Sequence, residues 1–323
     1  MGRRIGLLVV LPAVAVAVAC ESFDSSSEPP VVVDAGGAGD AGALEAGTAP
    51  EAGVTSGACD PGKPFGVAEP VAGLPGDGMV SAGLTEDELQ IVYASDGDVV
   101  DPGGRAGNTH LSFARRSSRA EAFGEPKPLP ALDVGIDQRW ATFDPDGLGL
   151  WFQAVEPTDA GDTIRIWRTR RPNQASSDFA PPNLFTVPLQ DPIVGSPTVT
   201  RSGSTLYFVS GAPALHLRRV PLQPQLGTAV SLDELATGIS ENTPVPTSAD
   251  VGLYYARHTA SRDEIWFAQR ASTSDRYTKI AAVDELNQGS LNMPVWLSPD
   301  DCRLYFVSNR GGTYRIYVAA KGR

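Results

Sequence analysis

The sequence predicts an all-β protein, a β-propeller of four-stranded blades, and three observations support that prediction. The 34 glycines and 27 prolines make up 61 of the 323 residues, so the chain turns often and leaves little room for long helices. A short apolar strand recurs five times, which is the pattern of a repeat architecture. The last repeat lacks a final strand, and a matching strand stands alone before the first repeat.

The recurring apolar strand is the second strand of each repeat. A polar turn precedes every copy and suits a tight hairpin, because Asp, Asn and Gly tolerate the positive φ that such turns need. The central aliphatic residues of successive copies are 59, 56, 47 and 51 positions apart. The five copies are Leu89–Tyr93, Leu148–Phe152, Ser204–Phe208, Val251–Tyr255 and Cys302–Phe306.

Other extended segments flank each copy and complete a unit of four strands. A first strand precedes the turn, as at 140–143. A fourth begins with an aromatic residue and proline, as at Phe123–Pro126 and Phe179–Pro182 and less clearly at Tyr277, and proline suits an outermost strand. Four strands in about 50 residues are typical of a propeller blade. The third strands are His110–Ala114, Ile164–Trp167, Leu215–Leu217, Glu264–Ala268 and Arg315–Ala319.

Several third strands end in arginine. The residues are Arg115, Arg171, Arg219 and Arg270, and we expect them to lie in solvated turns.

The two ends of the chain predict how the ring closes. Residues 65–74 match 123–132 at Phe, Gly, Pro and Leu, so they form a fourth strand without the preceding three. The last unit stops at Arg323, just after its third strand. We therefore expect the N-terminal strand to complete the C-terminal blade, which closes the ring and removes an exposed edge.

The last unit also carries a family resemblance. The segment 298–312, followed by 314–318, resembles the WD40-like repeat, called PD40, of the TolB C-terminal domain. The likeness covers roughly residues 60–323. It implies a propeller that contacts other envelope proteins. Propellers of the TolB type commonly have six blades, so six is the alternative to the five counted here.

The N-terminus is typical of an exported protein. Arg3 and Arg4 precede an apolar run of 15 residues, Ile5–Ala19, which is shorter than the roughly 20 residues needed to cross a bilayer as a helix. We interpret residues 1–19 as a signal peptide. The following cysteine suggests more than simple export.

The segment Ala17–Cys20 resembles the lipobox of bacterial lipoproteins. The resemblance implies that Cys20 is lipid-modified and becomes the first residue of the mature chain. We expect a protein that is exported and lipid-anchored to the bacterial outer membrane or cell envelope. The alternative is an ordinary signal peptide that is cleaved nearby.

Residues 20–58 predict a disordered tether, and 59–323 form the propeller domain. The tether contains no Lys, Arg, Trp or Tyr, and cannot bury enough apolar surface to offset its ordering entropy. As a coil it would span roughly 35 Å. Without the signal peptide the net charge is 24 − 38 = −14, of which the tether carries −7. This balance argues against nucleic acid or an anionic membrane surface as a partner.

The remaining cysteines predict a disulfide. Cys302 lies in the hairpin between the first and second strands of the last blade, and Cys59 precedes the N-terminal strand by a few residues. Strands alternate in direction, so both lie at the same rim of that blade. An exported protein meets an oxidising environment. We predict a bond between Cys59 and Cys302, with two free thiols as the alternative.

No motif in the sequence points to a cofactor or a catalytic centre. His110, His216 and His258 belong to different blades, so we expect no metal site. A cluster of Asp96, Asp98 and Asp101 could hold Ca²⁺ through its oxygens, but we favour a plain acidic turn. Gly-x-Ser-x-Gly elbows and Gly-rich phosphate loops are missing from the sequence.

The candidate binding residues enter the first strand of each blade, where polar side chains would line the central channel. We predict a binding or scaffolding module, a monomer whose partner is an envelope protein, a peptide or a glycan. The alternative is a five-bladed glycosidase that uses a pair of channel carboxylates. The candidate residues are Asp77, Asp137, Gln138, Arg139, Glu241, Asn242 and Asn292.

Overall fold

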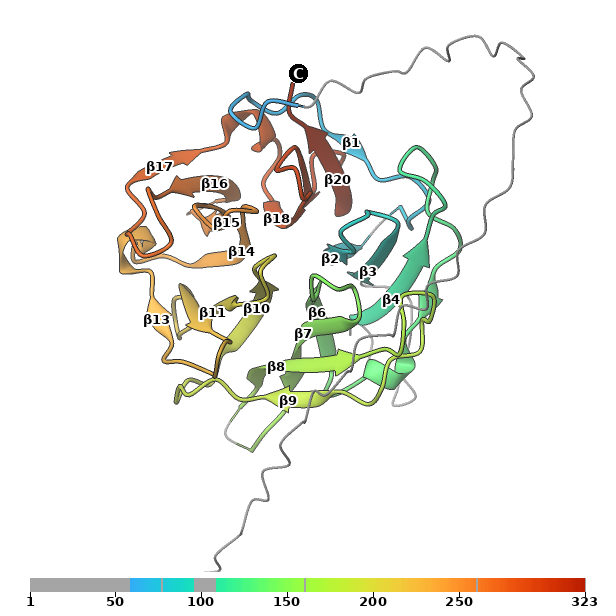
Figure 1. Cartoon of the computed structure of the whole chain (residues 1–323), viewed down its shortest axis with the longest axis horizontal. Helices are drawn as coiled ribbons and strands as arrows, with labels where there is room; N and C mark the ends of the chain where they lie inside the picture. The colour runs from blue at the N-terminus through green and yellow to red at the C-terminus, as the bar shows by residue number, and fades with distance from the viewer. Residues whose placement is uncertain (1–58, 77, 96–108, 160, 260, 323) are drawn as a thin grey trace, which may run out of the picture. The chain divides into compact units, whose positions relative to one another are not determined.

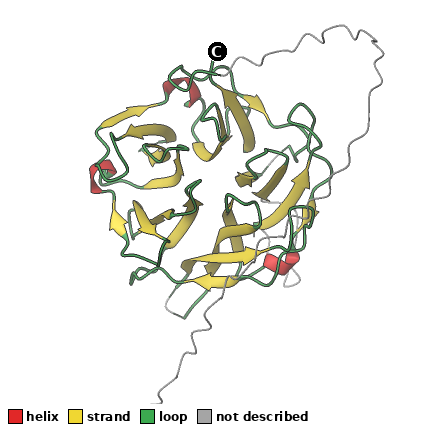
Figure 2. Cartoon of the chain, viewed as in Figure 1, coloured by secondary structure: helices red, strands yellow, loops and turns green. Residues whose placement is uncertain are grey.

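The repeats fold into five four-stranded antiparallel sheets, which surround a common axis as the blades of a propeller (Figure 1). The computed structural model describes residues 59–76, 78–95, 109–159, 161–259 and 261–322, which fall in one compact unit, Ser56–Arg323. Strands and loops make up nearly all of this unit (Figure 2). No helix in the described ranges is long and apolar enough to cross a membrane.

Blades 1 to 4 each consist of four consecutive strands. Blade 1 contains β2 (Met79–Leu84), β3 (Gln90–Ser95), β4 (His110–Arg115) and β5 (Lys127–Pro128). Blade 2 contains β6 (Asp137–Phe143), β7 (Gly149–Glu156), β8 (Thr163–Arg170) and β9 (Asn183–Phe185). Blade 3 contains β10 (Val194–Val199), β11 (Thr205–Ser210), β12 (His216–Pro221) and β13 (Val230–Ser231). Blade 4 contains β14 (Glu241–Pro246), β15 (Gly252–His258), β16 (Asp263–Gln269) and β17 (Lys279–Ala282).

Blade 5 closes the ring with strands from both ends of the chain. It contains β18 (Asn292–Leu297), β19 (Arg303–Ser308) and β20 (Arg315–Ala320), and its outermost strand is β1 (Glu69–Pro70). The predicted closure by the N-terminal strand is therefore confirmed, and so is the count of five blades (Figure 1). The six-bladed alternative is wrong, because the strands of the described residues form five sheets.

The fourth strands begin a few residues later than the sequence predicts. In blade 1, for example, Phe123 is buried before the strand starts at Lys127. Phe179 and Tyr277 are buried in the same way. The aromatic side chains thus anchor the chain on the blade, and the short strand pairs only after the anchor.

The hairpins between first and second strands share one turn geometry. In each turn the fourth residue has a positive φ, and its amide donates a hydrogen bond to the carbonyl three residues earlier. Gly or Asp at most of these positions lowers the cost of that conformation. The five residues are Glu88, Gly147, Gly203, Asp250 and Asp301.

The core consists of five apolar layers, one between each pair of neighbouring blades. The second strands supply the most buried residues, because both faces of these strands are covered. Leu150, Leu206, Leu253 and Leu304 have no exposed surface. Three 3₁₀ helices in the described residues add one buried leucine each to these layers: η1 (Pro130–Leu132), η2 (Asp233–Leu235) and η3 (Asp284–Leu286).

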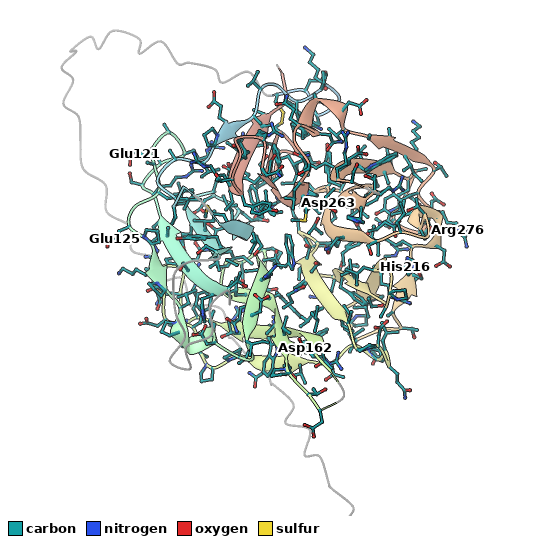
Figure 3. The ribbon with its side chains drawn as sticks, turned by 180° about the vertical axis from the view of Figure 1, so that it is seen from behind. Glu121, Glu125, Asp162, His216, Asp263 and Arg276 are labelled. Carbon is teal, nitrogen blue, oxygen red and sulfur yellow. A yellow bond between two sulfur atoms is a disulfide. The ribbon has the colours of Figure 1, made fainter. Side chains whose placement is uncertain are left out.

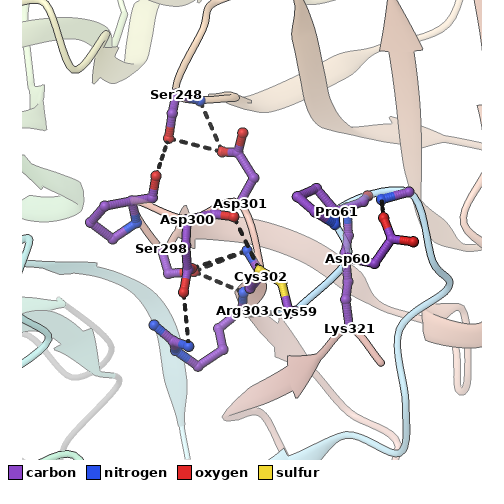
Figure 4. The surroundings of a disulfide bond; sticks show 12 residues. Cys59, Asp60, Pro61, Ser248, Ser298, Asp300, Asp301, Cys302, Arg303 and Lys321 are labelled. Atoms are coloured by element: carbon purple, nitrogen blue, oxygen red, sulfur yellow. Dashed lines mark hydrogen bonds and ion pairs between the residues drawn. A yellow bond between two sulfur atoms is a disulfide. The ribbon is translucent and has the colours of Figure 1, made fainter. Parts of the chain in front are cut away.

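The structure contains the predicted disulfide between Cys59 and Cys302 (Figure 4). The two Cα atoms are 6.1 Å apart, and 243 positions separate the residues in the sequence. The bond joins the segment before β1 to the β18–β19 hairpin. It therefore links the two ends of the chain within blade 5.

Candidate functional site

The channel-entry residues of blade 2 bond to one another and to their own loop. Arg139 Nη2 lies 2.9 Å from Asp137 Oδ2, so this cation and this carboxylate form an ion pair. Gln138 is buried, and its Nε2 donates to the carbonyl of Val134 at 2.9 Å. The three side chains thus hold the start of β6 in place.

Glu241 and Asn292 are fully buried at the starts of β14 and β18. Glu241 Oε1 accepts hydrogen bonds from the amide and the hydroxyl of Thr237, at 2.9 and 2.7 Å. Asn292 Oδ1 accepts one from the hydroxyl of Ser308 at 2.8 Å. The bonds of Glu241 fasten the loop before β14, and that of Asn292 joins β18 to β19 within blade 5. Neither buried side chain is presented to a ligand.

The two remaining predicted positions differ from each other. Asn242 Oδ1 accepts a hydrogen bond from Ser196 Oγ at 2.6 Å, which joins the first strands of blades 4 and 3. Asp77 lies outside the described residues, as do Cys20 and the cluster of Asp96, Asp98 and Asp101.

The space on the propeller axis is small. A cavity of about 10 Å³ lies between the first strands, lined by Trp140, Ser196, Thr243 and Pro294 among others. A second cavity of about 40 Å³ lies at the hairpin end. Since one water needs roughly 10–15 Å³, neither space admits a sugar ring.

Arg201 closes the hairpin end of the axis. It comes from the turn of blade 3 and pairs with Glu86 of blade 1 at 2.7 Å. Its Nε donates to Ser248 Oγ of blade 4 at 3.0 Å, and its guanidinium lies 5.5 Å above the ring of Trp296 in blade 5. One side chain therefore ties four blades together.

Each histidine lies beside a carboxylate. The Nδ1 atoms of His110, His216 and His258 are 3.1, 3.4 and 3.0 Å from carboxylate oxygens. His216 lies beside the buried Glu241, and His258 lies beside Asp263. Figure 3 labels His216 and Asp263. Among the described residues, no group of His, Cys, Asp or Glu could hold a metal ion.

A second kind of site lies between blades, and the junction of blades 3 and 4 shows its complete form. Arg270 is almost fully buried there, although the sequence predicted a solvated turn. Its Nη2 donates to the hydroxyl of Tyr207 at 3.0 Å and lies 3.0 Å from Asp250 Oδ2. Its Nε donates to the carbonyl of Asp250, and its guanidinium lies 4.8 Å from the ring centre of Tyr277.

The junction of blades 5 and 1 repeats this arrangement. Arg116 Nη2 donates to the hydroxyl of Tyr305 at 3.2 Å, and Arg116 Nε donates to the carbonyl of Glu88 at 2.8 Å. The guanidinium lies 4.5 Å above the ring of Phe123. The Tyr305 hydroxyl in turn donates to the Glu88 carboxylate at 2.7 Å. We call this set of tyrosine, turn acid, arginine and aromatic ring an arginine latch.

The junction of blades 4 and 5 has the same residue classes but not the same contacts. The tyrosine is Tyr254, the turn acid is Asp301 and the ring is Phe65. Lys321 stands in place of the arginine, with its Nζ 5.0 Å above the ring of Phe65 and 5.7 Å above that of Tyr254. That Nζ donates to the carbonyl of Pro61 at 2.6 Å instead of to the tyrosine (Figure 4).

A groove of about 650 Å³ opens at this junction, within the size range of ligand pockets. Tyr254 and Phe267 form an aromatic wall, with ring centres 4.6 Å apart. Its charged lining residues are Glu285, Asp301, Lys63 and Lys321. We call this space the 4/5 groove.

Burial governs the ionisation of the groove. It raises the pKa of Tyr254 above its ordinary value, and the nearby carboxylates of Asp301 and Glu285 raise it further. The hydroxyl is therefore neutral at pH 7 and able both to donate and to accept. Burial also lowers the pKa of Lys321, against the opposing effect of the same two carboxylates and of Asp60.

Sequence reasoning missed the latches and the groove, but a signal was available. In blades 1, 2 and 4 an aromatic residue follows the junction arginine by seven or eight positions: Arg116 and Phe123, Arg171 and Phe179, Arg270 and Tyr277. In blade 5 the pair is split between the chain ends, as Lys321 and Phe65. That split hides the pattern until the ring is closed.

No protein-family model matches this chain, and no curated protein does either. Similar solved structures include TolB from Acinetobacter baumannii, with a TM-score of 0.46 and 14% identity over 76% of this chain, which spans only 55% of that TolB chain. A putative glycoside hydrolase from Parabacteroides distasonis has a TM-score of 0.52 and 10% identity over 83% of this chain and 95% of its own. The catalytic domain of the GH62 α-L-arabinofuranosidase from Coprinopsis cinerea has the same score and identity over 80% and 97%. At such identities the likeness shows the β-propeller fold alone.

Proposed function

We propose that this protein is an exported, lipid-anchored β-propeller that binds a partner at the cell envelope. In this proposal residues 1–19 are a signal peptide, Cys20 carries the lipid and 20–58 form the tether of the propeller, 59–323. The apolar run and the small residues before Cys20 support export and lipidation.

The contrast between axis and groove supports binding over catalysis. Glycoside hydrolysis needs two carboxyl groups that face a bound sugar. Here the carboxylate of Asp137 is paired with Arg139 and that of Glu241 is buried against Thr237. The two axial cavities hold only about 10 and 40 Å³. The 4/5 groove is roomy by comparison, at about 650 Å³.

The test compares the full chain with a Cys20→Ala variant in bacterial cells. We expect the full chain to incorporate labelled fatty acid, to remain with the envelope membranes and to capture one partner saturably there. The variant should lose the label and leave the membrane fraction, because the lipid is the anchor. A Cys59→Ala variant is the control and should keep its label.

Two results would contradict the proposal. One is a full chain that carries no fatty acid. The other is turnover of aryl glycosides that falls at least about 100-fold in Asp137→Asn or Glu241→Gln, as removal of a catalytic carboxyl group would require.

A further inference from the structure

We propose that the 4/5 groove binds the guanidinium of an arginine in an extended peptide of a partner protein. The inference deepens the proposed binding role and rests on it. Its basis is internal to the molecule, since two other junctions show what the same residue classes hold.

Junction 4/5 matches junction 3/4 in the residue classes that surround the buried arginine. At junction 3/4 the buried arginine bridges the Tyr207 hydroxyl, the Asp250 carboxylate and the Tyr277 ring. At junction 4/5 the corresponding groups are those of Tyr254, Asp301 and Phe65. Even the supporting contact is repeated. Glu234 Oε1 accepts the amide of Tyr277 at 3.1 Å, and Glu285 Oε1 accepts the amide of Phe65 at 3.0 Å.

Two polar groups in the groove have no hydrogen-bond partner among the described residues, the hydroxyl of Tyr254 and the carbonyl of Asp301. Within the described residues, the Tyr254 hydroxyl has no hydrogen-bond partner, whereas those of Tyr207 and Tyr305 each bond to an arginine. The turn carbonyls of Glu88, Gly147 and Asp250 each accept a hydrogen bond from an arginine Nε at 2.8–3.0 Å.

The corresponding carbonyl of Asp301 accepts no hydrogen bond in the described part of the chain. A hydroxyl and a carbonyl that accept a guanidinium elsewhere are therefore both open in the groove. Lys321 cannot replace the arginine guanidinium of the other junctions, because its ammonium is a point charge and donates its hydrogen bond to Pro61.

Charged and aromatic side chains line the groove. Glu285 and Asp301 bring two carboxylates to the groove, and Lys321 holds its ammonium above the rings of Phe65 and Tyr254. Lys63 also lines the groove, so its two carboxylates are matched by two ammoniums. The attraction for a cation therefore rests on the turn acid Asp301, whose counterpart Asp250 holds Arg270 at junction 3/4. Aromatic faces also attract a weakly hydrated guanidinium.

The remaining feature concerns the rest of the ligand. The groove extends along Ala281, Ala282 and Val283 at the end of β17. This strand is the outermost of blade 4 and pairs only with β16, so its other edge is open to an extended chain. An added strand gives affinity through the main chain, and a pocket beside it selects one side chain. An arginine within a peptide fits both features.

The test uses the purified full chain and two acetylated tripeptide amides, Ala-Arg-Ala and its citrulline counterpart. Citrulline has nearly the same shape but no charge. Titration calorimetry should show saturable binding of the arginine peptide and at least about tenfold weaker binding of the citrulline peptide, the loss expected for a charged donor replaced by a neutral one. Equal affinities, or no saturable binding of the arginine peptide, would overturn the assignment.

Three variants locate the site. Tyr254→Phe removes an acceptor and should weaken binding about tenfold. Lys321→Arg should fill the groove with the chain's own guanidinium, abolish peptide binding and raise the unfolding midpoint. Tyr207→Phe makes the same change at the complete junction 3/4 and should leave peptide affinity unchanged. Unchanged affinity in Tyr254→Phe or in Lys321→Arg would contradict the proposal.

A further variant covers a failure of Tyr254→Phe to fold. Asp301→Asn removes the negative charge of the carboxylate. Asparagine tolerates the φ of 57° and can still accept the hydrogen bond from the amide of Ser248. It too should weaken arginine binding. If the arginine peptide does not displace a captured envelope partner, the groove is not the arginine site, although the proposed envelope-binding function still holds. If the groove binds the arginine peptide but no envelope partner is captured, the arginine site holds and the proposed function is contradicted.

Discussion

Single arginine side chains hold the junctions between blades. Arg171 and Arg270 are 2% and 3% exposed, unusual for a side chain that stays charged. Arg171 lies among the rings of Phe113, Phe143 and Phe179, and its Nη1 donates to Gln90 Oε1 at 2.7 Å. Such a cation can be buried because turn carbonyls, aromatic rings and side-chain oxygens contact its planar guanidinium from several directions.

Replacing Arg270 with methionine should destabilise the protein by about 3 kcal/mol, because the hydroxyl of Tyr207 and the carboxylate of Asp250 lose a buried partner. Urea unfolding monitored by tryptophan fluorescence measures the loss. Arg276→Met is the control, since Arg276 is exposed at the outer edge of the ring (Figure 3). A loss of similar size in both variants would contradict the role of the latch.

At the scale of elements, the closure of blade 5 depends on a very short strand. β1 consists of two residues, Glu69 and Pro70, and pairs with β20. An isolated bridge between Phe65 and Lys321 extends the pairing, and the disulfide lies beyond it. The amides of Asp60, Gly66 and Val71 also donate to carbonyls in or next to β20, and the disulfide adds a covalent restraint to these bonds.

A Cys59→Ser, Cys302→Ser double variant should lose up to about 5 kcal/mol of unfolding free energy, the value from loop entropy for so long a loop. The urea midpoint of the variant, compared with that of the oxidised wild type, measures the loss. Reducing agent should bring the wild type down to the level of the variant and leave the variant unchanged. A reduced wild type as stable as the oxidised one would disprove the restraint.

At the scale of the whole molecule, five apolar layers between blades hold the ring together. Tyrosines of the second strands and of the anchors contribute to these layers, and Tyr93, Tyr255 and Tyr277 are all nearly inaccessible. Burial raises the pKa of each to about 12. An ionised phenolate has no place in such a layer.

We therefore predict that the protein loses stability as the pH rises from 10 to 12. The unfolded chain releases these phenolic protons near pH 10 and the folded chain near pH 12, so the stabilisation is complete below 10 and falls above it. Thermal unfolding midpoints across this range measure the loss. Tyr277→Phe should lose less stability than the wild type between these pH values. An equal slope in both proteins would show that Tyr277 is not among the groups responsible.

Local sequence patterns predict most of the fold. The second and third strands, the polar hairpin turns, the exchange of the N-terminal strand and the disulfide all follow from short segments and their spacing. The starts of the fourth strands did not, because Phe123 and Phe179 look like strand residues until their burial is known. The channel positions were located along the chain, but the direction of side chains such as Glu241 depends on the loop that packs over them.

The sequence by itself determined the repeat, its four-stranded unit and the way the ring closes, because alternation, turn chemistry and spacing are local properties. Only the tertiary structure decided which turn faces which strand. That contact between blades buries Arg270 against Tyr207, and it leaves Tyr254 facing a lysine and an open groove. The same residue classes thus produce a closed latch at one junction and an open groove at another, because the ammonium of Lys321 is a point charge whose hydrogen bond goes to Pro61.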